Sequence, residues 1–131
     1  MRVGVGLFMA AALAGAPAAW AERVVFSVYF DWGVMTLDAK AKQAVAGAMK
    51  RVQACADNGV SVQGHTDTSE DNVSELATER ARAVRNELLA KGVADSRVGF
   101  VGRSDRQPAV PTADGVREVK NRRAEIVLVC D

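Results

Sequence analysis

The segment from Val60 to Arg82 constrains the fold more than any other part of this 131-residue chain. It begins with apolar residues at alternate positions, a pattern typical of a half-buried β-strand. The polar residues 65–72 follow, and an apolar repeat at helical spacing begins at Leu76. The sequence therefore predicts a strand, a tight polar loop and a helix in immediate succession. Backbone N–H groups and the helix dipole converge at such a junction, which suits it to hold an anion or a zwitterion.

Residues 1–21 have the form of a secretory signal peptide. The basic residue Arg2 precedes an uncharged run rich in Ala and Gly, and Ala19-Trp20-Ala21 forms a small-x-small cleavage site. The alternative is an uncleaved membrane anchor, because the uncharged run is nearly long enough to span a bilayer. We expect cleavage, which would leave residues 22–131 as one periplasmic domain without a transmembrane segment.

The charge balance of the exported part excludes one large class of partner. Of the 17 basic residues only Arg2 lies in the leader, so the exported part has 16 basic residues against 16 acidic ones. A nucleic-acid-binding protein normally needs a basic excess, so we expect no nucleic-acid partner. Both cysteines, Cys55 and Cys130, lie in the exported part. An oxidising compartment favours a disulfide between them, and two buried thiols are the alternative.

The other predicted strands and helices follow from the same two periods. Alternating or β-branched runs typical of strands occupy the ranges 24–30, 60–64, 97–102 and 124–130. A long helix with an apolar face begins after Thr36, its expected N-cap. The helix after the polar loop begins at Asn72, in a capping box with Glu75, and a further helical turn is expected within 115–122. The order βαβαβ(α)β predicts an α+β sandwich, with two helices on one face of a four-stranded sheet.

Four motifs in these elements resemble the OmpA-like peptidoglycan-binding domain found in Pal-type lipoproteins and flagellar stator proteins. The motifs are Val28-Tyr29-Phe30-Asp31, Gly64-His65-Thr66-Asp67, Leu76-Ala77-Thr78-Glu79-Arg80-Ala81 and Asn121-Arg122-Arg123-Ala124-Glu125-Ile126. They occur in the family's order across the whole of residues 22–131, which makes the resemblance specific. It implies a mixed sheet with strand order 1-4-2-3 and a last strand antiparallel to its neighbours. In that fold the end of the first helix and the end of the last strand lie at one pole, where Cys55 and Cys130 could bond.

The resemblance also implies a ligand, the meso-diaminopimelate residue of the peptidoglycan stem peptide. The free end of that side chain carries an ammonium and a carboxylate on one carbon. By match to the family motif, Asp67 would accept from the ammonium and Arg80 would clamp the carboxylate through two hydrogen bonds. Thr66, Phe30 and Asp31 are expected at the same site, the last two at its rim. A lysine stem peptide has no side-chain carboxylate and would leave Arg80 desolvated and unpaired.

Each of these residues also has a purely structural interpretation. Asp67 could cap the turn or the helix, and Arg80 could form an internal ion pair because it lies on a largely apolar helical row. His65, the only histidine, is expected to be a hydrogen-bonding turn residue. Three further polar residues could support the ligand or brace the loops: Asn121, Arg122 and Arg123.

The polar loop departs from the family pattern. It is about two residues shorter than the usual form, and Val73 stands where the family has an asparagine. Ser69, Glu70 and Asp71 occupy the region where a glycine is expected after Asp67. The two added carboxylates would repel a ligand carboxylate unless they point outward.

Two functions remain open on this evidence. The first is a non-catalytic periplasmic module that binds diaminopimelate and positions an envelope component on the cell wall. The second is a structural domain without a ligand that binds a protein partner in an envelope complex. An enzyme is disfavoured, because the sequence has a single histidine and no spacing typical of metal ligands. We therefore expect no cofactor and no metal.

Overall fold

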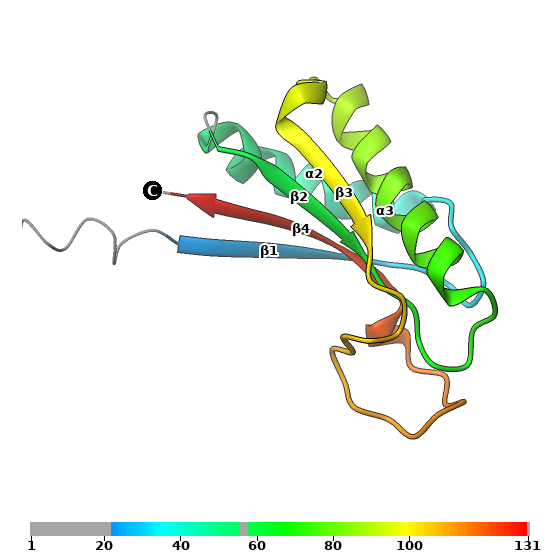
Figure 1. The fold of residues 1–131 in the computed structure, drawn as a ribbon. Helices are drawn as coiled ribbons and strands as arrows, with labels where there is room; N and C mark the ends of the chain where they lie inside the picture. The colour runs from blue at the N-terminus through cyan, green and yellow to red at the C-terminus, as the bar shows by residue number, and fades with distance from the viewer. Residues whose placement is uncertain (1–21, 56–57, 131) are drawn as a thin grey trace, which may run out of the picture.

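Strands and helices alternate along the chain in the expected order (Figure 1). The computed structural model describes residues 22–55 and 58–130, so the expected signal peptide, 1–21, lies outside the described residues. The main elements are β1 (Glu22–Tyr29), α2 (Ala39–Ala54), β2 (Val60–Gly64), α3 (Val73–Ala90), β3 (Val98–Gly102) and β4 (Arg123–Cys130). Two short 3₁₀ helices, η2 (Asp95–Arg97) and η3 (Val119–Asn121), precede β3 and β4. Within the described ranges, no helix is long and apolar enough to cross a membrane.

The sheet has the order β1-β4-β2-β3, as the resemblance implied. β4 runs antiparallel to both β1 and β2, whereas β2 and β3 are parallel. Gly64 at the end of β2 is in register with Gly102 at the end of β3 and with Ala124 near the start of β4. β1 also ends at this end of the sheet, where Tyr29 is opposite Arg123. The loops 30–38, 65–72 and 103–118 therefore all lie at the same end of the strands.

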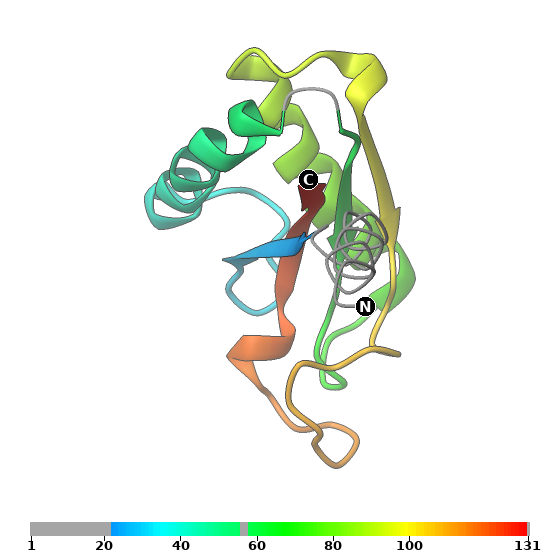
Figure 2. The ribbon, with the colours of Figure 1, turned by 90° about the vertical axis from the view of Figure 1, so that its left-hand side faces the viewer.

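The core lies between one face of the sheet and the two helices, and the α+β class is confirmed (Figures 1 and 2). β2 has the alternation expected of a half-buried strand, with Val60 and Val62 buried and the residues between them partly exposed. The helices contribute apolar rows at steps of three and four, which face the sheet. Fully buried side chains of this core include Val28, Val45, Val52, Val62, Val84, Leu88 and Ile126.

The capping of both helices differs from the sequence-based expectation. Asp38, not Thr36, caps α2, and its Oδ1 accepts a hydrogen bond from Ala41 N at 2.7 Å. A carboxylate at this position also interacts favourably with the positive end of the helix dipole. Asn72 is the N-cap of α3 as expected, but its φ of 48° is left-handed and its side chain makes no capping hydrogen bond. The predicted capping box is therefore wrong, because an N-cap side chain normally reaches the first turn from an extended backbone.

A disulfide joins the two ends that the resemblance placed at one pole. Cys55 is the C-cap of α2, Cys130 ends β4, and their Cα atoms are 5.4 Å apart. The expected pairing is confirmed. β4 starts at the end of the sheet where the three loops lie, so the disulfide at Cys130 lies at the opposite end of β4.

Candidate ligand-binding site

Three loops far apart in sequence meet at the end of the sheet opposite the disulfide. Figure 1 shows the loops 30–38, 65–72 and 103–118 gathered at the same end of the strands, and in Figure 2 the loop 103–118 projects beyond them. Thr68 Oγ1 donates to Ala113 O at 3.2 Å, which ties the second loop to the third. Most of the residues predicted from the motifs lie on these loops or at the element ends beside them.

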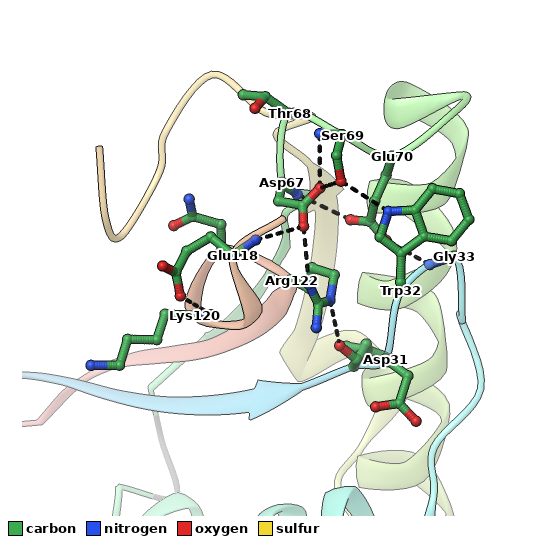
Figure 3. A network of polar contacts seen from close by, with 12 residues as sticks. Asp31, Trp32, Gly33, Asp67, Thr68, Ser69, Glu70, Glu118, Lys120 and Arg122 are labelled. Atoms are coloured by element: carbon green, nitrogen blue, oxygen red, sulfur yellow. Dashed lines mark hydrogen bonds and ion pairs between the residues drawn. The ribbon is translucent and has the colours of Figure 1, made fainter. Parts of the chain in front are cut away.

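Asp67 is completely buried among hydrogen-bond donors from two loops. Its Oδ1 accepts from Ser69 N at 2.9 Å and from Ser69 Oγ at 2.7 Å. Its Oδ2 accepts from Glu118 N and from Arg122 Nη1, both at 3.0 Å. Figure 3 shows these donors arranged around the carboxylate. The carboxylate therefore links the loop after β2 to the segment before β4.

These donors determine the ionisation of Asp67. Burial is the largest single influence and by itself would raise the pKa of this carboxyl. The hydrogen bonds from Ser69, Glu118 and Arg122 together outweigh it, and they hold the pKa of Asp67 below its usual value. Asp67 is therefore a stable anion at neutral pH.

Arg80 lies fully buried on α3 and uses its whole guanidinium group. Nε donates to Val34 O at 2.9 Å, Nη1 to His65 O at 3.0 Å and Nη2 to Asp31 O at 3.2 Å. The remaining donors go to Glu70, from Nη1 at 2.8 Å and from Nη2 to the second carboxylate oxygen. A guanidinium has five N–H donors, so every donor of Arg80 has an acceptor within the chain.

Glu70 occupies a site made of four donors, which we call the carboxylate cage. The cage consists of Gly33 N, Asp67 N and the Nη1 and Nη2 groups of Arg80. Glu70 Oε2 accepts from Gly33 N at 2.8 Å, and Oε1 accepts from Asp67 N at 3.0 Å. The Glu70 side chain thus points inward, whereas Asp71 beside it is exposed. A buried cation requires a counter-charge, and Glu70 supplies it to Arg80.

The other residues predicted at the site lie around this cage. The Phe30 ring lies against Arg80, with the guanidinium carbon 5.2 Å from the ring centroid, a cation–π distance. Asp31 contacts Arg80 through its carbonyl oxygen, and the residue as a whole is exposed at the rim. Thr66 is buried, and its Oγ1 has no hydrogen-bond partner among the residues that the structure describes.

The polar residues before β4 hold the loops in place. The Asn121 side chain exchanges two hydrogen bonds of 2.8 Å with the backbone of Val110. Arg123 Nη2 donates to Gln107 O at 3.1 Å, in the same long loop. Arg122 joins Asp67 directly and therefore belongs to both the bracing and the site. These contacts match the alternative in which the three residues brace the loops. The contact from Arg122 also fixes the position of Asp67.

His65 is buried close to the site and is uncharged at neutral pH. Burial, followed by the positive charge of Arg123 and, less strongly, of Arg103, lowers the pKa of His65 to about 4, although Glu125 acts in the opposite direction. Neither ring nitrogen of His65 has a hydrogen-bond partner among the described residues. The expectation that this side chain forms a hydrogen bond in the turn is therefore wrong.

Sequence reasoning missed Trp32 as part of the site. The indole Nε1 donates to Ser69 Oγ at 2.9 Å (Figure 3). The Arg117 guanidinium carbon lies 4.4 Å from the indole centroid. The residue therefore joins all three loops. Its partners lie 37 and 85 residues further along the chain, and no local period marks such a contact. Only its position directly after Asp31 could have drawn attention to it.

The arrangement is suited to binding a carboxylate beside a buried aspartate. Two charged and two backbone N–H donors converge on one carboxylate, and charge-assisted hydrogen bonds of this kind are the strong ones. Among the described residues, no group of three His, Cys, Asp or Glu side chains is placed to hold a metal ion.

The chain is similar to proteins of the bacterial envelope. A sequence model of the OmpA family matches residues 29–122. An outer membrane protein of Gluconacetobacter diazotrophicus is 33% identical over 111 residues, which cover 79% of this chain and 29% of that protein. A peptidoglycan-associated lipoprotein of Pasteurella multocida is 34% identical over 101 residues, covering 75% of this chain and 67% of the lipoprotein. The chain thus spans less than a third of the first relative's length.

Solved structures support the same fold. The OmpA-like domain of FopA1 from Francisella tularensis superposes with a TM-score of 0.72 at 19% identity, covering 82% of this chain and 73% of that one. At this level of identity the likeness concerns the fold alone.

Proposed function

Because this chain belongs to the OmpA family, we propose that it is a non-catalytic peptidoglycan-binding module that acts in the periplasm. The carboxylate cage beside Asp67 is the observation that carries the proposal. Glu70 Oε1 accepts both from Asp67 N and from Arg80 Nη1, so a carboxylate in the cage lies next to the aspartate. The name of the Pasteurella relative associates that protein with peptidoglycan, and this supports the choice of ligand.

The proposed ligand is the zwitterionic end of a meso-diaminopimelate side chain in the stem peptide. Its carboxylate would enter the cage and pair with Arg80 through two parallel hydrogen bonds. Its ammonium would interact with Asp67, which is an anion at neutral pH. Phe30, Asp31 and Thr66 would line the rim and floor of the same site. Such binding would position an envelope component on the cell wall.

A second function has an observation in its favour. Glu70 already fills the cage, and Asp67 is fully hydrogen-bonded within the chain. A domain satisfied in this way could serve as a structural part of an envelope complex, in contact with a protein partner and without a wall ligand.

Calorimetric titration of the oxidised chain distinguishes the two functions. Stem peptides containing meso-diaminopimelate and lysine are titrated separately. The wall-binding function predicts saturable heat with the diaminopimelate peptide, and at least tenfold weaker binding of the lysine peptide, a difference of about 1.4 kcal/mol. Absence of heat with both peptides would support the interaction domain.

A pair of conservative variants tests the residue that would carry the binding. Arg80→Lys keeps the charge but loses the planar fork, so binding of the diaminopimelate peptide should be lost. Arg82→Lys is the matched control, because this arginine lies on the same helix with an exposed side chain. Equal affinity of both variants would exclude Arg80 as the carboxylate-binding residue.

A further inference from the structure

The candidate site is saturated by the protein itself. All five N–H donors of Arg80 have acceptors, and three of these acceptors are backbone carbonyls. Each carboxylate oxygen of Asp67 accepts two hydrogen bonds, which uses the four lone-pair directions of that group. A ligand therefore finds no free donor on Arg80 and no free acceptor on Asp67 in this conformation.

We propose that Glu70 is an internal substitute for the ligand carboxylate, and that ligands bind by replacing it in the carboxylate cage. The identity of the ligand rests on the proposed function above, whereas the replaceable occupancy of the cage does not. Among the hydrogen-bond acceptors of Arg80 in the described chain, Glu70 is the only one that accepts through a side chain. It can leave by side-chain rotation, whereas the backbone carbonyls stay where the loops hold them.

The surroundings of Glu70 allow this movement. Glu70 lies in the loop 65–72, and the two residues that follow it, Asp71 and Asn72, are exposed. A pocket of about 280 Å³ borders the cage and is lined by Trp32, Gly33, Met35, Asp71, Asn72, Glu75 and Leu76. Gly33 contributes one cage donor and also lines the pocket, so the pocket adjoins the cage at this residue, whereas the Glu70 and Arg80 side chains are fully buried.

Electrostatics require an exchange of carboxylates. A buried guanidinium without a counter-charge is strongly unfavourable, so Arg80 must keep one carboxylate partner throughout. Exchange of Glu70 for a ligand carboxylate conserves the number of buried charges and of charge-assisted hydrogen bonds. Ligands without an anionic group cannot perform this exchange. The internal competitor also weakens binding, because each ligand must displace Glu70 before it gains the cage.

The first experiment uses acetate as a probe of the cage. Glu70→Ala removes the internal carboxylate and should lower the melting temperature of the oxidised chain. Acetate should restore it in a saturable manner, because a ligand that binds only the folded state stabilises that state by mass action. Chloride at equal ionic strength should not. Asp114→Ala is the control: it removes an exposed carboxylate that belongs neither to the cage nor to the pocket lining, and it should show no acetate dependence.

The second experiment measures the affinity for the diaminopimelate stem peptide in the same variants. Glu70→Ala and the near-isosteric Glu70→Gln should both bind about tenfold more tightly than the natural chain, and the control variant Asp114→Ala should match the natural chain. Glu70→Gln keeps the side-chain volume and decides the matter if the alanine variant does not fold.

The outcomes separate the two proposals. Acetate rescue without any peptide binding would support the internal substitute and contradict wall binding. Equal peptide affinity in the natural chain and in the Glu70 variants would overturn the internal substitute and leave wall binding intact. Failure of acetate to stabilise Glu70→Ala, together with no gain in affinity for Glu70→Gln, would also overturn it.

Discussion

The loops at the end of the sheet are arranged around one buried cation. Arg80 donates to the loop 30–38 at Val34 O and Asp31 O, and to the loop 65–72 at His65 O. Glu70 supplies its counter-charge. These contacts hold the backbone that presents Asp67, so the same arginine has a structural role and a proposed ligand-binding role. A substitution of Arg80 is therefore expected to affect both.

Asp67 offers a cleaner test, because its neighbours are donors that need an anion. Asp67→Asn replaces one acceptor oxygen by an NH₂ group, which leaves two donors without an acceptor: either the N and Oγ groups of Ser69, or Glu118 N and Arg122 Nη1. We expect the free energy of unfolding at neutral pH to fall by about 2 kcal/mol, measured by urea denaturation. Asp71→Asn, on the exposed position of the same loop, should change it by less than about 0.5 kcal/mol. Equal stabilities would show that the Asp67 charge is not needed.

His65 predicts a pH dependence with a defined sign. Its pKa is about 4 in the folded chain against 6.5 for an ordinary histidine, so the unfolded chain binds more protons between these values. The free energy of unfolding should therefore fall as the pH falls from about 6.5 towards 4. His65 is the only histidine, so His65→Gln should flatten the profile between about pH 5 and 6.5. Denaturation curves across that window measure the slope, and an unchanged slope in the variant would contradict the prediction.

At the residue scale, motif matching singled out Asp67 and Arg80 but did not predict that Glu70 pairs with Arg80 and that Arg122 pairs with Asp67. Asp67 and Arg80 were found because they belong to motifs within one continuous segment. Glu70 was recognised as an added carboxylate, yet its inward direction depends on the buried position of Arg80 and on Gly33 N from another loop. Trp32 was missed, and Arg122 was named only as a possible supporting or bracing residue, because their contacts span 37 and 55 residues and leave no local pattern.

At the scale of elements, the close approach of α3 to β2 sets the position of Arg80. A Cβ atom on Gly64 would lie 1.8 Å from Ala77 O and 2.8 Å from Ala77 C, both in the helix backbone. The glycine therefore lets the helix pack directly on the end of the strand. Arg80 lies almost one helical turn after Ala77, so its guanidinium is brought to the loop that follows Gly64.

Gly64→Ala tests this approach. The new methyl group would collide with helix backbone and force the helix away from the strand, so we expect destabilisation of about 3 kcal/mol or more. Gly99→Ala in β3 is the matched control, because a Cβ atom there has no neighbour within 4 Å. The measurement is the midpoint of chemical denaturation for both variants. Similar midpoints would contradict the close packing of α3 on β2.

The elements themselves were largely predictable because each follows one period. β2 alternates buried and partly exposed residues over Val60–Gly64 as expected, and α3 ends at Ala90, followed by the C-cap Lys91 and by Gly92, whose φ is 101°. The ends were less predictable. The N-cap of α2 moved from Thr36 to Asp38, because both residues are good N-caps and the choice between them depends on how the helix packs on the sheet.

At the scale of the molecule, periodicity predicted the order of elements and the layer of helices but not the arrangement of strands. The order β1-β4-β2-β3 places the last strand in the interior of the sheet. That position followed from the family resemblance, since nothing in the sequence of Arg123–Cys130 states which strands it pairs with. The same arrangement places the site and the disulfide at opposite ends of β4.

This separation predicts that the disulfide supports stability without shaping the site. Cys55 and Cys130 are 75 residues apart, so their bond removes much of the freedom of the unfolded chain. The chain-entropy relation gives a loss of about 4 kcal/mol in the free energy of unfolding when the bond is absent. The double variant Cys55→Ser with Cys130→Ser should show this loss in urea denaturation, and added reductant should affect the natural chain but not the variant.

The affinity of the folded variant for the stem peptide, or for acetate after Glu70→Ala, should stay within about twofold of the disulfide-bonded chain. The reason is that the disulfide lies at the opposite end of β4 from the site. A variant that keeps its stability but loses binding would show instead that the disulfide acts on the site along β4.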